Sequence, residues 1–496
     1  MRINSFTNLR ALLLDNKTTK QTIFKNTFWV ALASAIGDFS KFILIIYVTR
    51  ILGATEFGKF AFALSFISLF FIFNNFGLSS IVTREFSRGE EKEKDFSSII
   101  SLRILLGLGA TALILIGSFF ITPDPIIRKV IWVLAVFSQI SNFSLIIYAF
   151  FGARQKMEYE SWSIILEAAT VTAVGFFVIF NFPSILNLSY SYLLSVVFSL
   201  ILALTLLHFK VFRLRISWNV SVWKKYLAMS WPLGLISLFS IIYISIDSVM
   251  LGYLGKITEN GWYSAAYKMA LFTTMPMGII ATSFFPVLSK FFEESKEKFQ
   301  TVWDYYMEII ISLAIPLVAG GILLAPRIID FLYGKNFYPS VLAFQILMIM
   351  AGIIFFSKPF TQILVASNQQ KKVFWITLMG ALTNIVLNLI LIPRYSLYGA
   401  AVATVITYFL MLFLLFSFIL KFTSLQLLNL RLFFSFIIIS FSTAVMSFTI
   451  SRPQIYNLNI FFSIIIGTTV YFIALYFLEK ILRRLGLKTF NLYESR

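Results

Sequence analysis

The chain has 496 residues, of which 59% are hydrophobic, 18% aromatic and 13% charged, whereas a soluble domain carries about 25% charged residues. So few charges cannot cover the water-exposed surface of a protein of this length, which excludes an ordinary soluble enzyme or binding domain. The formal net charge is +19 and cysteine is absent. The sequence therefore also excludes disulfides, thiolate metal sites and a cysteine nucleophile.

Continuous apolar runs divide the chain into segments that can cross a bilayer. About 20 residues of helix, at about 1.5 Å per residue, span a hydrocarbon core of about 30 Å. The runs do not alternate between apolar and polar residues, which argues against membrane strands. We therefore predict an all-α membrane protein with about fourteen transmembrane helices, at 27–49, 59–81, 97–120, 128–151, 162–181, 187–208, 228–252, 263–285, 304–324, 339–366, 372–392, 399–420, 431–450 and 458–479.

The basic residues indicate how these helices are oriented. With a cytoplasmic N-terminus, the inner segments hold 28 of the 41 Lys and Arg residues, the outer loops hold 9 and the spans hold the other four. Cytoplasmic loops carry such an excess of Lys and Arg, so both termini are predicted to face the cytoplasm from the cell membrane. Because the basic charge is spread over short loops, we expect no nucleic-acid partner.

The predicted spans group into two six-helix lobes with two helices appended. The lobes are residues 27–210 and 228–421, joined by a basic cytoplasmic linker at 211–227. Residues 1–26 form a basic cytoplasmic lead-in without the apolar core and cleavage site of a signal peptide. Residues 422–496 add two helices and a basic cytoplasmic tail.

Motifs for catalysis are missing from the sequence. No GxxxxGK[ST] loop is present to hold nucleotide phosphates. The single histidine, His208, follows an apolar run beside Lys210, where an interfacial position is expected, and Asp124 stands alone between two prolines. We therefore expect neither an enzyme nor a bound metal or cofactor, and transport is the leading class of function.

A short repeat relates the two predicted lobes. Residues 52–63 read Leu-Gly-Ala-Thr-Glu-Phe-Gly-Lys-Phe-Ala-Phe-Ala, and residues 254–266 read Leu-Gly-Lys-Ile-Thr-Glu-Asn-Gly-Trp-Tyr-Ser-Ala-Ala. With one inserted residue, the Leu-Gly and Thr-Glu pairs, the following glycine and the aromatic two residues later all align. Parallel repeats of this kind are typical of transporters whose lobes rock around a central site.

Residues 50–58, Arg-Ile-Leu-Gly-Ala-Thr-Glu-Phe-Gly, resemble the end of the first span in a family of polysaccharide exporters. These are the Wzx-like flippases of the multidrug/oligosaccharidyl-lipid/polysaccharide (MOP) exporter superfamily. Further matches follow in order over roughly residues 25–425, at 76–78, 83–85, 246–248, 251–252, 263–268, 332–334, 384, 388, 392–393 and 398–401.

The resemblance implies transport of a lipid-linked oligosaccharide. The cargo would be attached to a polyprenyl phosphate or pyrophosphate and would move from the inner to the outer leaflet for surface polysaccharide assembly. Membrane lipids and a polysaccharide polymerase or other assembly protein are the implied partners. A lipid II flippase for peptidoglycan and a multidrug/cation antiporter of the same superfamily stay open as alternatives.

Ionisable residues inside the spans are the candidate site residues, because each costs about 2.5–3.5 kcal/mol on insertion scales and therefore faces a cavity or a partner. Four cations are candidates for a cavity that binds cargo phosphate: Lys41, Arg103, Lys268 and Lys358. Three acids are candidates for pairing or for coupling an ion: Asp38, Glu167 and Asp247.

Alternatives stay open for these residues. Asp38 and Lys41 lie three residues apart on one helix face, so they form either a local pair or a cavity wall with Asp38 tuning Lys41. Asp247 and Lys268 are expected at similar depth on consecutive antiparallel helices, where they form a salt bridge unless Asp247 couples an ion. Arg103 and Glu167 lie near span ends, from which they can also snorkel to the interface. Amides in the spans are candidates either for sugar hydroxyls or for interhelical hydrogen bonds, namely Asn74, Asn75, Gln139, Asn142, Asn384 and Asn388.

Overall fold

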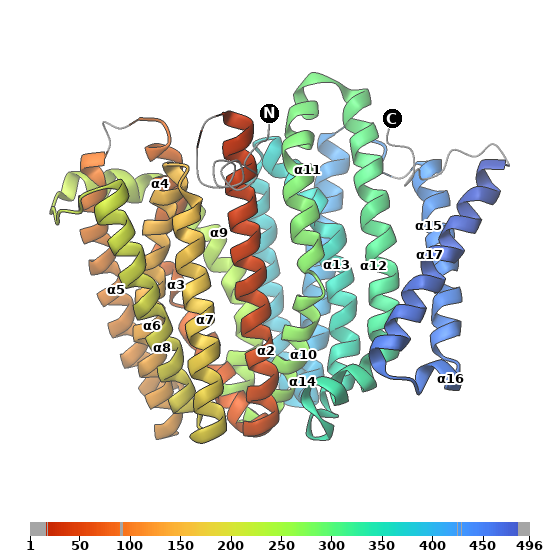
Figure 1. Ribbon diagram of the computed structural model, residues 1–496, viewed down its shortest axis with the longest axis horizontal. Helices are drawn as coiled ribbons and strands as arrows, with labels where there is room; N and C mark the ends of the chain where they lie inside the picture. Colours follow the sequence, from red (N-terminus) through yellow and green to blue (C-terminus); the bar gives the residue numbers. More distant parts are fainter. Residues whose placement is uncertain (1–15, 17, 90–92, 424, 428, 485–496) are drawn as a thin grey trace, which may run out of the picture. The chain divides into compact units, whose positions relative to one another are not determined.

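The computed structural model describes residues 16, 18–89, 93–423, 425–427 and 429–484, and every regular element within them is helical (Figure 1). Twelve of the described helices are apolar and long enough to cross a membrane. Two of them, α2 (Thr19–Ser68) and α14 (Gln370–Phe422), are each divided by one non-helical residue, at Gly53 and Ser396. Each of these two helices supplies two crossings, so the described chain has fourteen spans and the predicted all-α membrane fold is confirmed.

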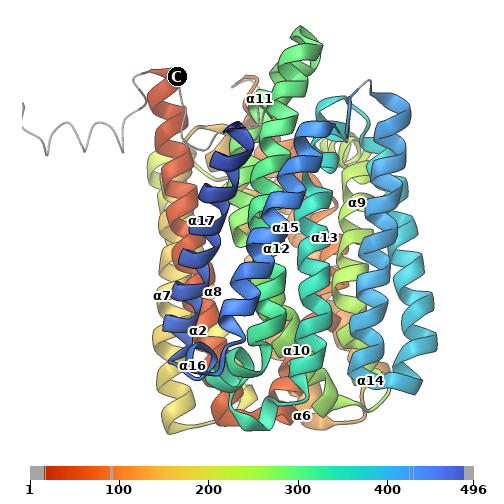
Figure 2. The ribbon, with the colours of Figure 1, turned by 90° about the vertical axis from the view of Figure 1, so that its right-hand side faces the viewer.

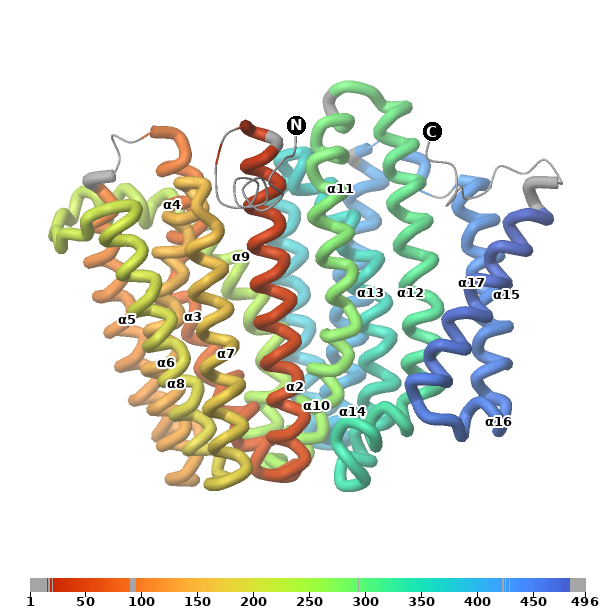
Figure 3. The backbone as a smooth tube through the Cα atoms, viewed as in Figure 1, coloured from red at the N-terminus to blue at the C-terminus, as the bar shows by residue number. Residues whose placement is uncertain are grey.

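Both divided helices turn back at their dividing residue. The 50 residues of α2 would extend about 75 Å as one straight helix, more than twice the hydrocarbon thickness. Figure 3 shows the tube of α2 reversing at its lower end. The two arms of α14 lie side by side in Figure 2, and a Cβ atom on Gly380 would lie only 2.6 Å from the Met411 sulfur.

The chain divides into two compact units, residues 1–258 and 259–496. The first unit contains α2, α3 (Phe71–Asn75), α4 (Leu78–Phe86), α5 (Glu93–Ile121), α6 (Pro125–Ala153), α7 (Met157–Asn181), α8 (Ile185–Leu206), a π-helical turn at Leu207–Val211 and α9 (Val220–Tyr253). The second contains nearly all of α10 (Ile257–Phe272), then α11 (Met275–Glu294), α12 (Lys296–Tyr333), a 3₁₀ turn at Lys335–Phe337, α13 (Ser340–Ala366), α14, α15 (Leu430–Ile450), α16 (Pro453–Tyr456) and α17 (Ile460–Arg484).

The seventh span, α9, packs with the first unit. It contacts α2, α3, α4 and α5, whereas the sequence repeat assigned 228–421 to a second lobe. The boundary between the packed units therefore lies about one helix after the boundary that the repeat gives. The lobe boundaries taken from the repeat stay a prediction.

The core of the first unit contains a cluster of aromatic rings from four of its helices. The rings of Phe96 in α5 and Phe150 in α6 stack 4.1 Å apart, and Phe86 in α4 contacts both of them. Tyr226 in α9 stacks on Phe86 at 6.2 Å. Large rings bury much apolar area and prefer such stacked and edge contacts, so this cluster fixes one end of α4, α5, α6 and α9 relative to one another.

One span in each unit is broken into two helices. In the first unit, Phe76 and Gly77 have left-handed φ values of 45° and 75° and separate α3 from α4. A Cβ atom on Gly77 would lie 2.7 Å from the Ser230 carbonyl oxygen of α9, so both the turn and the close packing require glycine. In the second unit, residues 273–274 separate α10 from α11.

The predicted repeat is visible in the backbone. Gly53 and Gly255, aligned by sequence, have φ values of 78° and 76°, in the region that favours glycine. Each residue lies at the connection between two consecutive spans. The repeated Leu-Gly motif therefore gives the same left-handed backbone conformation at both connections.

The two appended helices, α15 and α17, pack against each other and against α12 (Figure 2). The Tyr471 hydroxyl of α17 donates to the Ser312 carbonyl at 2.8 Å. At one end of α12, Arg327 donates to the Ser463 hydroxyl at 2.9 Å and to the Leu458 carbonyl. Polar contacts thus fix the appended helices along the length of α12.

Candidate functional site

Lys41 and Glu167 form an ion pair between two spans of the first unit. The Lys41 ammonium lies 2.8 Å from Glu167 Oε1, and the side chains are 36% and 12% exposed. Asp38 is exposed and forms no ion pair with Lys41. Of the two alternatives for Lys41, the structure does not show the local pair with Asp38. The partner of Lys41 comes from α7, 126 residues away in sequence, and its role toward cargo stays a prediction.

Small residues allow the helices that carry this pair to pack closely. On one side of the pair, a Cβ atom on Gly175 of α7 would lie 2.8 Å from a methyl carbon of Leu44 in α2. Tyr47 packs on Phe176 with ring centroids 5.2 Å apart. Glycine at such a contact lets two membrane helices approach, so α2 and α7 position an exposed ammonium and its carboxylate partner inside the span.

Arg103 lies inside the first unit and not at an interface or on a cavity wall. Its side chain is 1% exposed, which rules out the snorkelling alternative in this structure. Its guanidinium donates to the Asn142 carbonyl at 2.6 Å, to Asn75 Oδ1 at 3.2 Å and to the Asn74 carbonyl. The Asn74 and Asn75 acceptors adjoin the break between α3 and α4, where helical bonding stops and carbonyl groups need other donors. Asn142 lies inside α6.

Among the described residues, no carboxylate lies within ion-pair distance of Arg103. Its partners are backbone carbonyls and one amide. The structure therefore shows Arg103 supporting the break and does not bring it to Lys41.

The predicted amide residues make contacts within and between helices. Asn142 donates to the Ser138 carbonyl at 2.8 Å. Asn384 and Asn388 of α14 are both 0% exposed, and Asn388 donates to Asn384 at 3.1 Å. The Gln139 amide packs directly over Gly107 of α5, where a Cβ atom would overlap it. The two hydrogen bonds each lie within one helix, and the Gln139 contact is the one of these three that packs two helices together.

The remaining predicted charges occupy different environments. Asp247 in α9 is fully buried in the first unit, and Lys268 in α10 is half-buried in the second. Their predicted salt bridge stays a prediction. Lys358 is exposed on α13, although 61% of the most apolar stretch of that helix is buried, the highest share among the twelve described spans. An exposed cation on such a buried helix favours a polar cavity.

Sequence reasoning missed two buried carboxylates in α12. Glu308 is 0% exposed and forms a two-bond ion pair with Arg431 of α15, both bonds 2.8 Å long. Asp304, one turn earlier, accepts from Asn429 at 2.9 Å. The available signal was the pair of acids four residues apart near the start of a span, followed much later by Arg431 at the start of another. We interpret this cluster as the attachment of α15 to α12.

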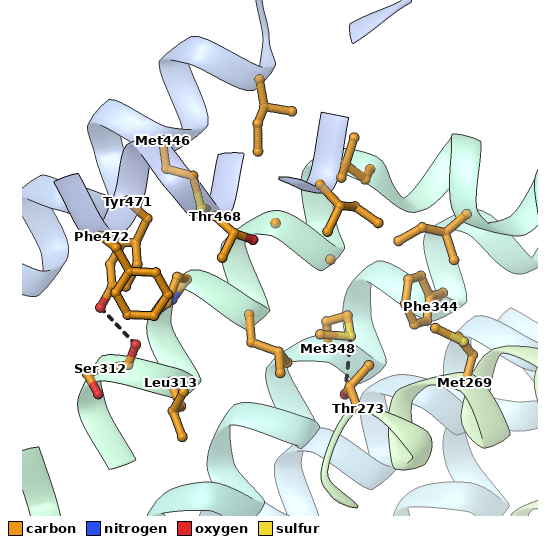
Figure 4. A pocket seen from close by; sticks show the side chains of 18 residues that line it. Met269, Thr273, Ser312, Leu313, Phe344, Met348, Met446, Thr468, Tyr471 and Phe472 are labelled. Carbon is orange, nitrogen blue, oxygen red and sulfur yellow. Dashed lines mark hydrogen bonds between the residues drawn. The ribbon is translucent and has the colours of Figure 1, made fainter. Parts of the chain in front are cut away.

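An apolar cavity of about 400 Å³ lies within the second unit (Figure 4). It lies among α10, α12, α13, α15 and α17, and its lining includes Met269, Leu313, Phe344, Met348, Met446 and Phe472. Such a lining suits a hydrocarbon chain. The sequence did not predict the cavity, because its residues have the composition of any membrane core.

Comparison with known proteins gives relatives over most of the chain. The capsular polysaccharide biosynthesis protein CapF of Staphylococcus aureus is 21% identical over 404 residues, which cover 78% of this chain and 97% of CapF. The probable low-salt glycan biosynthesis flippase Agl15 of Haloferax volcanii is 23% identical over 392 residues, covering 76% of this chain and 79% of Agl15.

Solved structures share the fold. The lipid II flippase MurJ, in an inward closed conformation, superposes with a TM-score of 0.73 at 17% identity, covering 93% of this chain and 99% of MurJ. An inward-facing multidrug resistance MATE family transporter of the MOP superfamily superposes with a TM-score of 0.66 at 16% identity, covering 78% of this chain and 96% of the transporter.

The family assignment rests on the first part of the chain. The sequence profile described as "Polysaccharide biosynthesis protein" matches residues 23–292, more than half of the 496 residues. Flippases among the relatives support a flippase or transporter role. This multi-pass membrane protein belongs to the polysaccharide biosynthesis protein family.

Proposed function

We propose that this protein flips a polyprenyl-phosphate- or polyprenyl-pyrophosphate-linked oligosaccharide from the inner to the outer leaflet by alternating access, for surface polysaccharide assembly. The observation that carries the proposal is the partly exposed ammonium of Lys41 inside a span, 2.8 Å from Glu167 Oε1. An anionic headgroup must lose its hydration when it crosses the low-dielectric core, and a fixed cation replaces part of that hydration.

Lys358 supports the same reading from the second unit, because its exposed charge lies on an otherwise buried helix. Lys268 is a further candidate. Arg103 is a weaker one, since its donors already serve carbonyl groups around the broken span. Asp247 stays a candidate either for pairing with Lys268 or for coupling an ion.

The apolar cavity of the second unit supports a lipid-linked cargo. Its volume of about 400 Å³ and its lining of methionine, leucine and phenylalanine side chains suit part of a prenyl chain. A soluble sugar would gain nothing there, because it has no apolar surface to bury.

The energy for flipping can come from the membrane potential. A pyrophosphate with about two negative charges gains roughly 4–5 kcal/mol when it moves outward across about 100 mV, inside negative. The proposal places the protein in the cell membrane with both termini in the cytoplasm, and it assigns transport without chemical conversion of the cargo.

A proteoliposome assay tests the function. A fluorescent prenyl-pyrophosphate oligosaccharide is placed in both leaflets, and an impermeant reductant bleaches the outer leaflet. A flippase is expected to make nearly all the fluorescence accessible, whereas protein-free vesicles keep about half protected. Unchanged protection with folded protein would contradict the proposal.

Lipid II flipping is the second candidate, favoured by the TM-score of 0.73 to MurJ over 93% of this chain. The same assay with fluorescent lipid II distinguishes the two. We expect faster flipping of the oligosaccharide carrier lipid than of lipid II. A cationic dye in the same vesicles tests the antiporter alternative. Faster movement of the dye than of either lipid would support an antiporter.

A further inference from the structure

The α8–α9 segment, residues 208–225, is basic throughout. It contains Lys210, Arg213, Arg215, Lys224 and Lys225, together with His208, and it has no Asp or Glu. Of these cations, Lys225 contacts Asp95 at 3.3 Å, while Lys210, Arg213, Arg215 and Lys224 are exposed. In Figure 1 the segment is the yellow-green stretch between α8 and α9.

Hydrogen bonds hold the backbone of this segment against α5. Ser101 donates to the Ser217 carbonyl at 2.7 Å, and the Asn219 amide donates to the Ser98 hydroxyl at 3.1 Å. The Trp223 indole donates to the Ser98 carbonyl at 2.8 Å. The segment is therefore a fixed surface of the first unit.

Between Phe212 and Arg215 the segment directs its apolar and basic side chains to opposite faces. Phe212 has the extended backbone angles φ −153° and ψ 128°, and successive side chains of an extended chain point to opposite sides. Phe212 packs on the rings of Phe96 and Phe150, at 5.9 and 5.7 Å, and Leu214 packs on the same core. Arg213 and Arg215 are left on the outer face, two residues apart and exposed.

Large apolar side chains are exposed beside these cations. Phe209 is 75% exposed, and Ile216 and Trp218 are each 66% exposed. The segment connects the ends of two spans, α8 and α9, so it lies at the membrane boundary. Cations next to exposed aromatic and branched side chains suit the zone between lipid headgroups and acyl chains.

We propose that the α8–α9 segment binds anionic phospholipids of the adjacent leaflet, with Arg213 and Arg215 contacting headgroup phosphates and Ile216 and Trp218 entering the boundary with the acyl chains. The basis is charge complementarity, because a segment with five cations and no acid faces a surface of anionic headgroups. The binding is independent of the cargo. It would fix the height of the first unit in the bilayer.

Native mass spectrometry of the delipidated full chain tests this proposal, with phosphatidylglycerol and phosphatidylcholine as probes. We expect phosphatidylglycerol to bind more tightly. The double variant Arg213→Gln/Arg215→Gln should weaken its binding by roughly fivefold for each cation, or roughly 25-fold in all. The matched control is Lys296→Gln/Lys298→Gln, which removes two exposed cations two residues apart that stand beside Glu297. The control should bind phosphatidylglycerol as the native chain does.

Equal weakening in both double variants would show a net-charge effect and overturn the proposal, as would equal binding of the two phospholipids. Prenyl phosphate serves as a third probe, because the cargo carries the same chemistry. Loss of prenyl phosphate binding alone in the Arg213/Arg215 variant would move the site to the cargo and also overturn the proposal. Thermal unfolding of each variant confirms that it is folded.

A second readout uses the absence of cysteine from the chain. A fluorophore on Ile216→Cys should be quenched by lipids that carry a spin label near the headgroup, and addition of phosphatidylglycerol should increase the quenching. Quenching that does not change when phosphatidylglycerol is added would contradict the proposal, whatever the outcome of the flipping assay.

Discussion

At the scale of single residues, the structure changes what the charges in the spans mean. Lys41 is paired across helices with Glu167, and Arg103 bonds to backbone carbonyls at a helix break. The sequence showed which residues are costly in a membrane. It could not show their partners, because Glu167 is 126 residues from Lys41 and neither helix has a pattern that marks the contact.

The Lys41–Glu167 pair should show coupling in stability. Lys41→Met leaves a carboxylate unpaired and Glu167→Gln leaves an ammonium unpaired. Each change should cost about 1–2 kcal/mol, less than a fully buried pair because Lys41 is partly exposed. The double variant should recover most of the loss in thermal unfolding. Strictly additive losses would show that the two side chains do not stabilise each other.

Arg103 should be required for the broken span. Arg103→Met leaves the buried Asn74 carbonyl at the break without its donor, and a loss of about 1–3 kcal/mol in the free energy of unfolding is expected. Arg394→Met is the control, because Arg394 is exposed and its loss should cost less than about 1 kcal/mol. Similar losses in the two variants would remove the structural role we assign to Arg103.

At the scale of elements, the sequence predicted the fourteen spans because each apolar run has the length of a bilayer crossing. The break at Phe76 and Gly77 was not predicted, since the run from 59 to 81 is apolar enough to form one span despite Asn74, Asn75 and Gly77. The packing of α9 with the first unit was not predicted either. The repeat shows which segments are similar in sequence, and it does not show which helices contact each other. The cavity among α12, α15 and α17 depends on side-chain shape. The pattern of apolar residues along the sequence does not show that shape.

Gly77 gives the element-scale prediction. Gly77→Ala adds a Cβ atom 2.7 Å from a backbone oxygen at a left-handed residue, so it should lower the unfolding temperature and reduce transport. Gly109→Ala is the matched control, since a Cβ there meets nothing within 4 Å and alanine favours a helix. A Gly77→Ala protein as stable as the control would contradict the assigned close packing of α4 and α9.

At the scale of the whole molecule, the predicted orientation rests on the distribution of Lys and Arg. Because the chain has no cysteine, single thiols report their side without background. Ser87→Cys and Ser451→Cys introduce thiols at exposed residues, predicted to be cytoplasmic and external respectively. In intact cells an impermeant maleimide should label only the thiol at 451. Labelling at 87 without labelling at 451 would show that the orientation is the opposite of the predicted one.

The central claim is that the first unit uses the Lys41 charge to carry an anionic lipid-linked glycan. The most direct test is the flipping rate of a prenyl-pyrophosphate oligosaccharide in proteoliposomes containing Lys41→Gln/Glu167→Gln, a variant that removes both charges of the pair together. We predict that this variant folds and that its flipping rate falls at least about tenfold, equivalent to about 1.4 kcal/mol. The single variant Lys41→Arg should keep part of the native flipping rate. A native rate in the double variant, at matched protein content, would contradict the claim and leave Lys41 and Glu167 as a structural pair.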